Sequence, residues 1–307
     1  MSELPYQRWD VFTDRPLAGN QLAVLLNGDG IEPELMQRIA NEFALPESTF
    51  VLPPESPDAQ FRVRIFTPGS ELPMAGHPTI GTAFALAHSG RIEPGAEQTV
   101  FELGIGPVPV TLEWRSGRLE RAWMSQPAPE FGPRLERPSD MAAALGVPSD
   151  DIAATGLPVQ VLSSGVPFLF VPLQSRAAVD AAALNRAGLL EVCRRLDEPE
   201  LPVYLFTLER GSDGATTYSR MFAPGLGIAE DPATGGASGP LAAYLARYRP
   251  DSLSRGEILV NVQGVAMKRP SRICMSVNVD APAESPVRVG GQSVMLGEGR
   301  LHLPEAL

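Results

Sequence analysis

The pattern of apolar and polar positions predicts many short strands and a few helices. Residues 61–66 alternate apolar and basic side chains, which is typical of a strand with one buried face. Residues 33–43 repeat apolar positions at helical spacing, and Pro33 suits the first position of a helix. Further strands are predicted at residues 8–12, 22–26, 48–52, 99–103, 108–114, 119–124, 159–163, 168–172, 204–209, 216–222, 257–263, 273–279, 287–289 and 293–296, and further helical segments at 140–145 and 177–196.

Two helical segments, residues 78–87 and 239–248, are apolar almost all round. A helix without a polar face is normally buried. The small residues Gly81 and Thr82 would let neighbouring strands come close to the first of these helices. We therefore expect each helix to be central, with a curved sheet wrapped around it.

The segment in front of each apolar helix is repeated. Residues 64–69 (RIFTPG) resemble residues 220–225 (RMFAPG), with the two arginines 156 residues apart, and Pro78 and Pro232 lie 154 apart. Repetition at half the chain length of 307 residues predicts two similar lobes. We expect an α+β fold of two pseudo-symmetric lobes, each a curved, mostly antiparallel sheet or barrel around its apolar helix.

Lobe boundaries follow from composition. Residues 126–138 contain four prolines and no periodicity, which is typical of a linker. We predict a first lobe over residues 1–125, which the last strand, about 294–307, could join, and a second lobe over residues 126–293.

Composition and charge narrow the functional classes. Hydrophobic residues make up 44% of the chain and charged residues 20%, so a packed core is available. The formal net charge of −11 disfavours nucleic acid as a partner. No stretch has the roughly 18 apolar residues of a membrane helix. With two cysteines and no secretion signal at the start, we predict a cytoplasmic protein with free thiols.

Glycines mark the expected start of both apolar helices. Gly76 precedes His77, and Gly235 precedes Gly236. Free backbone N–H groups and the positive end of the helix dipole favour an anion at such a position. Two such ends between two lobes would hold one small anionic molecule, most simply a carboxylate. The alternative is that these glycines only form turns.

Two titratable residues stand beside these helix starts. His77 is one of three histidines, and its place between Gly76 and Pro78 favours a surface or site position. Asp231 stands one residue before the paired proline Pro232, as His77 stands before Pro78. A capping carboxylate is the simpler interpretation of Asp231. As a pair across a cleft, His77 and Asp231 could orient a substrate or move its protons.

Several common sites are absent from the sequence. It contains no Gly-Lys-Ser/Thr phosphate loop, no His-Glu-x-x-His zinc pair and no Gly-x-Ser-x-Gly nucleophile elbow. No Gly-x-Gly-x-x-Gly motif follows a predicted strand. The few histidines and cysteines are scattered, so we predict no metal site.

Four motif regions together resemble the PhzF-like phenazine-biosynthesis isomerase family. They are DVFT at residues 10–13 with GN at 19–20, PESTF at 46–50, ELPMAGHPT at 71–79 and EDPATG at 230–235. The resemblance runs in order along essentially the whole chain. It implies the diaminopimelate-epimerase-like fold: two similar lobes, each a curved sheet around a central helix, with the site in the cleft.

The resemblance also implies a reaction. The best-understood member isomerises trans-2,3-dihydro-3-hydroxyanthranilate without a cofactor. Glu47, which spacing alone does not distinguish, would then be the general acid/base that carries a proton between carbon positions. His77 and Asp231 would hold or protonate the substrate. Residues of the same motifs would bind it, namely Asn20, Ser48, Gly76, Gly235 and Gly236. A homodimer is expected, because the family often forms one.

The sequence departs from the family pattern at two positions, and two functions other than a glutamate-dependent isomerase are considered. Gly236 stands where the family often has serine, and Gln21 stands where proline commonly follows Gly-Asn. The natural substrate can therefore differ from the phenazine precursor. Cysteine-dependent epimerases and racemases of the same fold are one rival, but Cys193 and Cys274 lie outside both corner motifs. A carboxylate-binding protein without turnover is the other.

Overall fold

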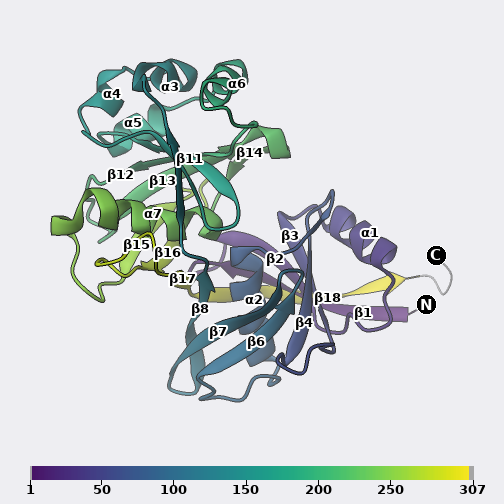
Figure 1. The fold of residues 1–307 in the computed structure, drawn as a ribbon. Helices are drawn as coiled ribbons and strands as arrows, with labels where there is room; N and C mark the ends of the chain where they lie inside the picture. Colours follow the sequence, from purple (N-terminus) through teal and green to yellow (C-terminus); the bar gives the residue numbers. More distant parts are fainter. Residues whose placement is uncertain (1, 304–307) are drawn as a thin grey trace. The chain divides into compact units, whose positions relative to one another are not determined.

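The computed structural model describes residues 2–303, which form two compact units (Figure 1). Unit 1 comprises the chain up to Ser125 together with the segment from Gly290 onward, and unit 2 comprises Gln126–Val289. The last strand thus returns to the first unit. Both units are α+β.

Unit 1 is one sheet with two helices. Its strand order is β18-β1-β2-β3-β4-β6-β7-β8, with β5 added beside β4. The pairs β2–β3 and β4–β6 are parallel and the others antiparallel. The elements are β1 (Ser2–Val11), β2 (Asn20–Leu25), α1 (Pro33–Phe43), β3 (Glu47–Leu52), β4 (Phe61–Phe66), β5 (Glu71–Leu72), α2 (Gly76–His88), β6 (Gln98–Leu103), β7 (Gly106–Arg115), β8 (Arg118–Gln126) and β18 (Ser293–Leu303).

Helix α2 is the centre of unit 1 (Figure 1). Every residue of Gly76–Leu86 is buried. A Cβ atom added at Gly81 would lie 2.5 Å from Leu22 Cδ2 and 2.7 Å from Val11 Cγ2, so only glycine allows β1 and β2 to come this close. Thr82 Oγ1 lies 2.9 Å from Thr49 Oγ1 of β3. The prediction of a central helix wrapped by strands is confirmed.

Unit 2 repeats this arrangement with β9-β10-β11-β12-β13-β15-β16 and with β14 beside β13. Again two pairs are parallel, β11–β12 and β13–β15. The elements are β9 (Glu130–Arg134), α3 (Pro138–Leu145), α4 (Asp150–Ala153), β10 (Gln160–Ser163), β11 (Pro167–Pro172), α5 (Arg176–Ala181), α6 (Arg186–Arg195), β12 (Val203–Thr207), β13 (Thr217–Ala223), β14 (Ile228–Asp231), α7 (Gly235–Tyr248), β15 (Leu259–Gln263), β16 (Ser271–Ser276) and β17 (Val287–Gly291).

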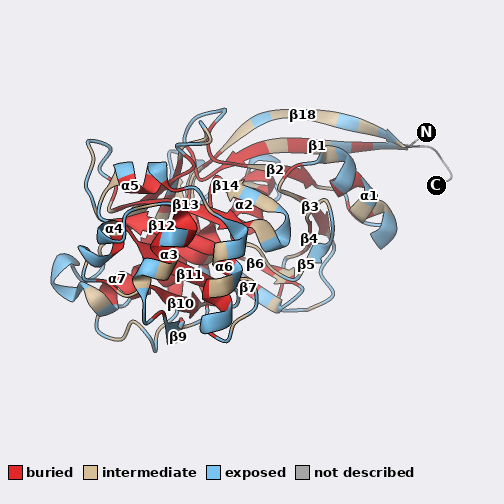
Figure 2. Ribbon diagram, turned by 90° about the horizontal axis from the view of Figure 1, so that it is seen from above, coloured by how far each residue is buried: buried red, intermediate tan, exposed pale blue. Residues whose placement is uncertain are grey.

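Helix α7 of unit 2 occupies the place of α2 in unit 1. It follows the short strand β14, as α2 follows β5, and most of its residues are buried (Figure 2). A crossover with helices joins the first parallel pair in both units: α1 between β2 and β3, and α5 and α6 between β11 and β12. The predicted fold of two pseudo-symmetric lobes is confirmed.

Two segments show more detail than their sequence patterns predicted. Unit 2 begins at the start of the expected linker, residues 126–138, and this segment also contains β9, which pairs with β10. The helical sequence at residues 177–196 is divided between two helices, α5 and α6. The second helix, α6, begins after Asn185, whose side chain accepts a hydrogen bond from Gly188 N, and this capping interaction explains the break.

The repeated hairpin has a different length in the two units. Arg64 of β4 makes two hydrogen bonds to Glu71 of β5, and Arg220 of β13 makes two to Glu230 of β14. The spacing is three residues longer in unit 2, where a 3₁₀ turn follows β13. Equivalent residues are therefore 156 apart before the hairpin and 159 apart after it. The pairing of Pro78 with Pro232 is wrong.

Candidate active site

The first residues of β2 and β3 meet the start of α2 at one corner of unit 1. Glu47 Oε2 lies 3.1 Å from His77 Nε2, and Asn20 Nδ2 lies 3.3 Å from His77 Nδ1. Because β2 and β3 run parallel, with Leu22 opposite Glu47, their N-terminal ends reach the same edge of the sheet. The corner brings together an amide, an imidazole and a carboxyl group that are distant in sequence.

All three side chains are largely withdrawn from solvent. Asn20 is fully buried, and the side chains of His77 and Glu47 are 6% and 15% exposed. Burial lowers the pKa of His77 to about 3, against a smaller opposing effect of the backbone of Gln21. The imidazole is therefore neutral near pH 7. Its Nδ1 faces the side-chain amide of Asn20, and its Nε2 is the ring nitrogen nearer Glu47.

Two polar features lie next to Glu47 in sequence or at the start of α2. Ser48 Oγ is buried and has no hydrogen-bond partner among residues 2–303. The N-cap residue of α2, Ala75, makes no side-chain cap, and the first residues of the helix are Gly76 and His77. Uncapped helix starts bind anions. The start of α2 therefore offers backbone donors to a ligand that carries acceptor atoms.

The loop before Asn20 is held in a constrained conformation. Gly19 has φ +67°, and a Cβ atom there would lie 2.2 Å from Val11 O. Leu17 also has positive φ, and its N–H donates to Asp10 Oδ2 at 2.8 Å. Glycine at position 19 and a buried aspartate at position 10 thus fix the turn that presents Asn20. Asp10 and Gly19, which belong to the matching motifs, therefore stabilise the backbone conformation of this loop.

The remaining predicted residues, Asp231, Gly235 and Gly236, lie together in unit 2. Asp231 ends β14, and its Oδ2 accepts a hydrogen bond of 2.5 Å from Thr234 Oγ1. Helix α7 begins at Gly235 after Thr234, and no side chain caps it. Thr234, and not Asp231, stands at the N-cap position of α7. A Cβ atom at Gly236 would meet only the Phe168 ring at 3.7 Å, so a serine would fit there.

Strand register shows which residues of unit 2 correspond to Glu47 and His77. Arg64 pairs with Phe50, and Arg220 pairs with Leu205, so Glu47, three residues before Phe50, corresponds to Pro202. In the same way His77, the second residue of α2, corresponds to Gly236, the second residue of α7.

This correspondence corrects the sequence comparison. Asp231 does not stand in the place that matches His77, because it precedes α7 by four residues. Unit 2 has proline and glycine where unit 1 has glutamate and histidine. The acid and imidazole belong to one half of the repeat only.

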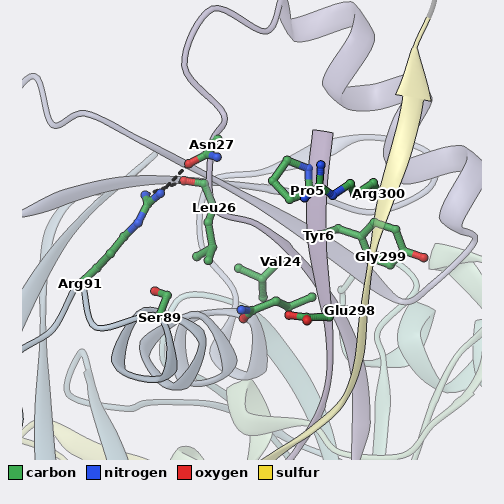
Figure 3. Close-up of a pocket in the computed structure, with 11 residues that line it drawn as sticks. Pro5, Tyr6, Val24, Leu26, Asn27, Ser89, Arg91, Glu298, Gly299 and Arg300 are labelled. Carbon is green, nitrogen blue, oxygen red and sulfur yellow. Dashed lines mark hydrogen bonds between the residues drawn. The ribbon is translucent and has the colours of Figure 1, made fainter. Parts of the chain in front are cut away.

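A cavity in another part of unit 1 does not include Asn20, Glu47 or His77. This cavity of about 550 Å³ is lined by residues of β1, β2 and β18 and by Ser89 and Arg91 after α2 (Figure 3). Both guanidinium groups in its lining are paired: Arg91 donates to Leu26 O and Asn27 Oδ1, and Arg300 donates to Glu3 Oε2. Within residues 2–303, no group of three or more His, Cys, Asp or Glu side chains could hold a metal ion, and no helix could span a membrane.

Sequence reasoning missed the contacts that support these residues. The backbone of Gln21 interacts with the His77 ring, and Gln263 hydrogen-bonds to Thr234 and to Asp231 O. The sequence distinguishes Gln21 only as a departure from the family pattern and Gln263 not at all, because both contacts depend on elements that the fold brings together.

Comparison with known proteins agrees with this site. Residues 9–299 match the family model described as phenazine biosynthesis-like protein. The trans-2,3-dihydro-3-hydroxyanthranilate isomerase of Pseudomonas aeruginosa is 38% identical, over 96% of this chain and 98% of that protein.

Solved structures show the same fold. A PhzF-family phenazine biosynthesis protein of Bacillus anthracis superimposes with a TM-score of 0.88 at 28% identity, over 99% of this chain and all of that one. A probable proline racemase from Agrobacterium radiobacter has a TM-score of 0.64 at 15% identity, over 99% and 94% of the two chains, and shares the fold alone. The chain therefore belongs to the phenazine biosynthesis-like family of PhzF proteins, relatives of which are named as isomerases.

Proposed function

We propose that the protein is a cofactor-independent isomerase in which Glu47 moves a proton between two carbon atoms of a small cyclic or amino carboxylate. The observation that carries this proposal is the 3.1 Å contact between Glu47 Oε2 and the buried, neutral imidazole of His77. A carboxyl group in a water-poor corner can act as base and then as acid without exchanging its proton freely with solvent.

His77 has an orienting role in this proposal. A neutral imidazole carries no positive charge that would stabilise the carboxylate form of Glu47, as an imidazolium would. The proton transfer is therefore assigned to Glu47. The imidazole Nε2 faces Glu47 and can hold the glutamate or a polar group of the substrate in position. Asn20, 3.3 Å from Nδ1, supports the ring from the other side.

The substrate carboxylate is proposed to bind the uncapped start of a central helix. Gly76 and His77 offer this end in unit 1, with Ser48 Oγ as a further donor, and Gly235 and Gly236 offer one in unit 2. Asp231 is proposed as a second group that holds or protonates the substrate. Trans-2,3-dihydro-3-hydroxyanthranilate is the first substrate to test, because the 38% identical relative is named for it.

A racemase mechanism with one thiol at each corner is disfavoured. Cys193 is in α6 and Cys274 is in β16, away from the starts of α2 and α7 in sequence. The place that corresponds to Glu47 in unit 2 is Pro202, which has no group to titrate. A single acid that both removes and returns a proton fits this asymmetry better than two opposed bases.

The variant Glu47→Gln separates an enzyme from a binding protein. It keeps the size and hydrogen-bonding capacity of the side chain but removes its ability to transfer a proton. Glu42→Gln, on the exposed surface of α1, is the matched control for the change in charge. We expect Glu47→Gln to abolish turnover and retain ligand affinity; normal turnover would refute the mechanism.

A thermal-shift screen of cyclic and amino carboxylates would find the ligand class, because a ligand that binds the folded state raises its stability by mass action. No shift with any carboxylate would count against the proposed anion site. We further propose a homodimer. A cytoplasmic location is proposed because the chain has only two cysteines, too few for a disulfide framework.

A further inference from the structure

A buried network of polar side chains lies behind Asp231 in unit 2. The Gln263 amide uses both of its ends: Nε2 donates to Asp231 O at 2.8 Å and to Thr234 Oγ1 at 2.9 Å. Its Oε1 accepts from Thr234 N at 3.1 Å and from Tyr204 Oη at 3.1 Å. Gln263 is fully buried, so each of these bonds is sheltered from water.

Two backbone groups fix the orientation of this amide. A peptide N–H can only donate and a peptide carbonyl can only accept, so Thr234 N requires Oε1 and Asp231 O requires Nε2. Turning the amide over would oppose donor to donor and acceptor to acceptor. The orientation of Gln263 is therefore determined by the main chain.

The fixed amide sets the direction of the Thr234 hydroxyl group. Because Nε2 donates to Thr234 Oγ1, the hydroxyl hydrogen is directed to Asp231 Oδ2, 2.5 Å away. Asp231 Oδ2 is thus an acceptor in this arrangement. We propose that Gln263 is a positioning residue, which acts through the Thr234 hydroxyl to fix the rotamer of Asp231 and to favour its carboxylate form.

Tyr204 supports Gln263 from the other side. Its hydroxyl group accepts from Asn261 Nδ2 at 2.8 Å, and Asn261 Oδ1 in turn accepts from Thr217 Oγ1. Burial raises the pKa of Tyr204 to about 12, so the phenol keeps the proton that it donates to Gln263. Ser219 Oγ also donates to the Tyr204 hydroxyl group at 3.2 Å, and Ser238 Oγ lies 3.1 Å from it.

This inference rests on the proposed role of Asp231, but it is measured first without any substrate. Carbon-13 NMR of the aspartate carboxyl groups follows the titration of Asp231, assigned with Asp231→Asn. Loss of a hydrogen bond to the charged form moves a carboxyl titration to higher pH. We expect this upward movement in Thr234→Val and in Gln263→Met, and its reversal in Thr234→Ser, which restores the hydroxyl group.

Tyr204→Phe and Tyr244→Phe are the matched pair for the remote part of the network. Both tyrosines are fully buried and each donates one hydrogen bond, Tyr244 to Pro158 O. We expect a lower melting temperature in both variants, but movement of the Asp231 titration only in Tyr204→Phe. An unmoved titration in Thr234→Val and Gln263→Met, or an equal movement in Tyr244→Phe, would overturn the proposal.

Turnover of trans-2,3-dihydro-3-hydroxyanthranilate then relates this positioning to catalysis. We expect Gln263→Met to lower kcat about tenfold, the effect of one charge-assisted hydrogen bond, with KM nearly unchanged. Full turnover in Asp231→Asn would refute the proposed role of Asp231, whereas the NMR titration would still decide the role of Gln263.

Discussion

The buried imidazole of His77 makes the stability of unit 1 depend on pH. Its pKa is lowered from 6.5 to about 3 by burial, so between these values the unfolded chain binds a proton that the folded protein does not. The contribution of the neutral ring to stability is complete above pH 6.5 and is lost as the pH falls toward 3.

The expected loss is at most about 1.4 kcal/mol for each pH unit in this window. Urea unfolding of the wild type and of His77→Gln at neutral pH and near pH 5 would measure it as a difference between the two proteins. The variant should show the weaker dependence on pH. Equal pH dependence, or an NMR titration of His77 at its ordinary value, would show that the ring is not buried in its neutral form.

At the scale of elements, the two Arg–Glu hairpins are alike in sequence but differ in burial. Arg220 and Glu230 have side chains 11% and 15% exposed, and Arg220 Nη1 also donates to three backbone carbonyl groups at the end of α5. Arg64 and Glu71 are 18% and 42% exposed. The pair in unit 2 thus joins its hairpin to α5 by hydrogen bonds, whereas the Arg64 side chain hydrogen-bonds to Glu71 of its own hairpin.

Substitution by lysine should therefore have unequal effects. Lysine cannot reproduce the planar fork of donors, so Arg220→Lys should cost about 3 kcal/mol by disrupting a buried network. Arg64→Lys should cost about 0.5 kcal/mol, as is usual for a more exposed pair. Chemical denaturation of both variants measures the two losses, and equal losses would contradict this distinction.

At the scale of the whole molecule, charge opposes the proposed homodimer. Each chain has a formal net charge of −11, so two copies repel one another at low ionic strength. Light scattering should give twice the chain mass of 32.8 kDa, with a dimer fraction that rises as salt is added. A mass of one chain at all salt concentrations would exclude the dimer.

Local pattern predicted most of the fold, and tertiary contacts decided the rest. The apolar helices α2 and α7 were predicted because a helix without a polar face must be central. The pairing of Pro78 with Pro232 was wrong because the second hairpin has three extra residues, and a fixed spacing cannot account for an insertion. Strand β9 was missed because two of its neighbours in sequence are prolines and its partner, β10, is remote.

The candidate site was predictable only in part. Glycines at helix starts indicated an anion site, but Glu47 was chosen through family resemblance, and its contact with His77 depends on the parallel pairing of β2 and β3. Gln263 acts through a buried amide whose partners are set by the fold. Such a role leaves no spacing pattern in a single sequence.

The most direct test of the central claim is hydrogen exchange at carbon. The wild-type protein and Glu47→Gln are incubated in D2O with trans-2,3-dihydro-3-hydroxyanthranilate or the best carboxylate from the thermal-shift screen, and proton NMR follows deuterium at the ligand carbons. We predict incorporation or isomerisation with the wild type and with Glu42→Gln, and none with Glu47→Gln, which still binds the ligand. Equal exchange by Glu47→Gln, or no reaction of the bound ligand with the wild type, would contradict Glu47 as the residue that moves the proton.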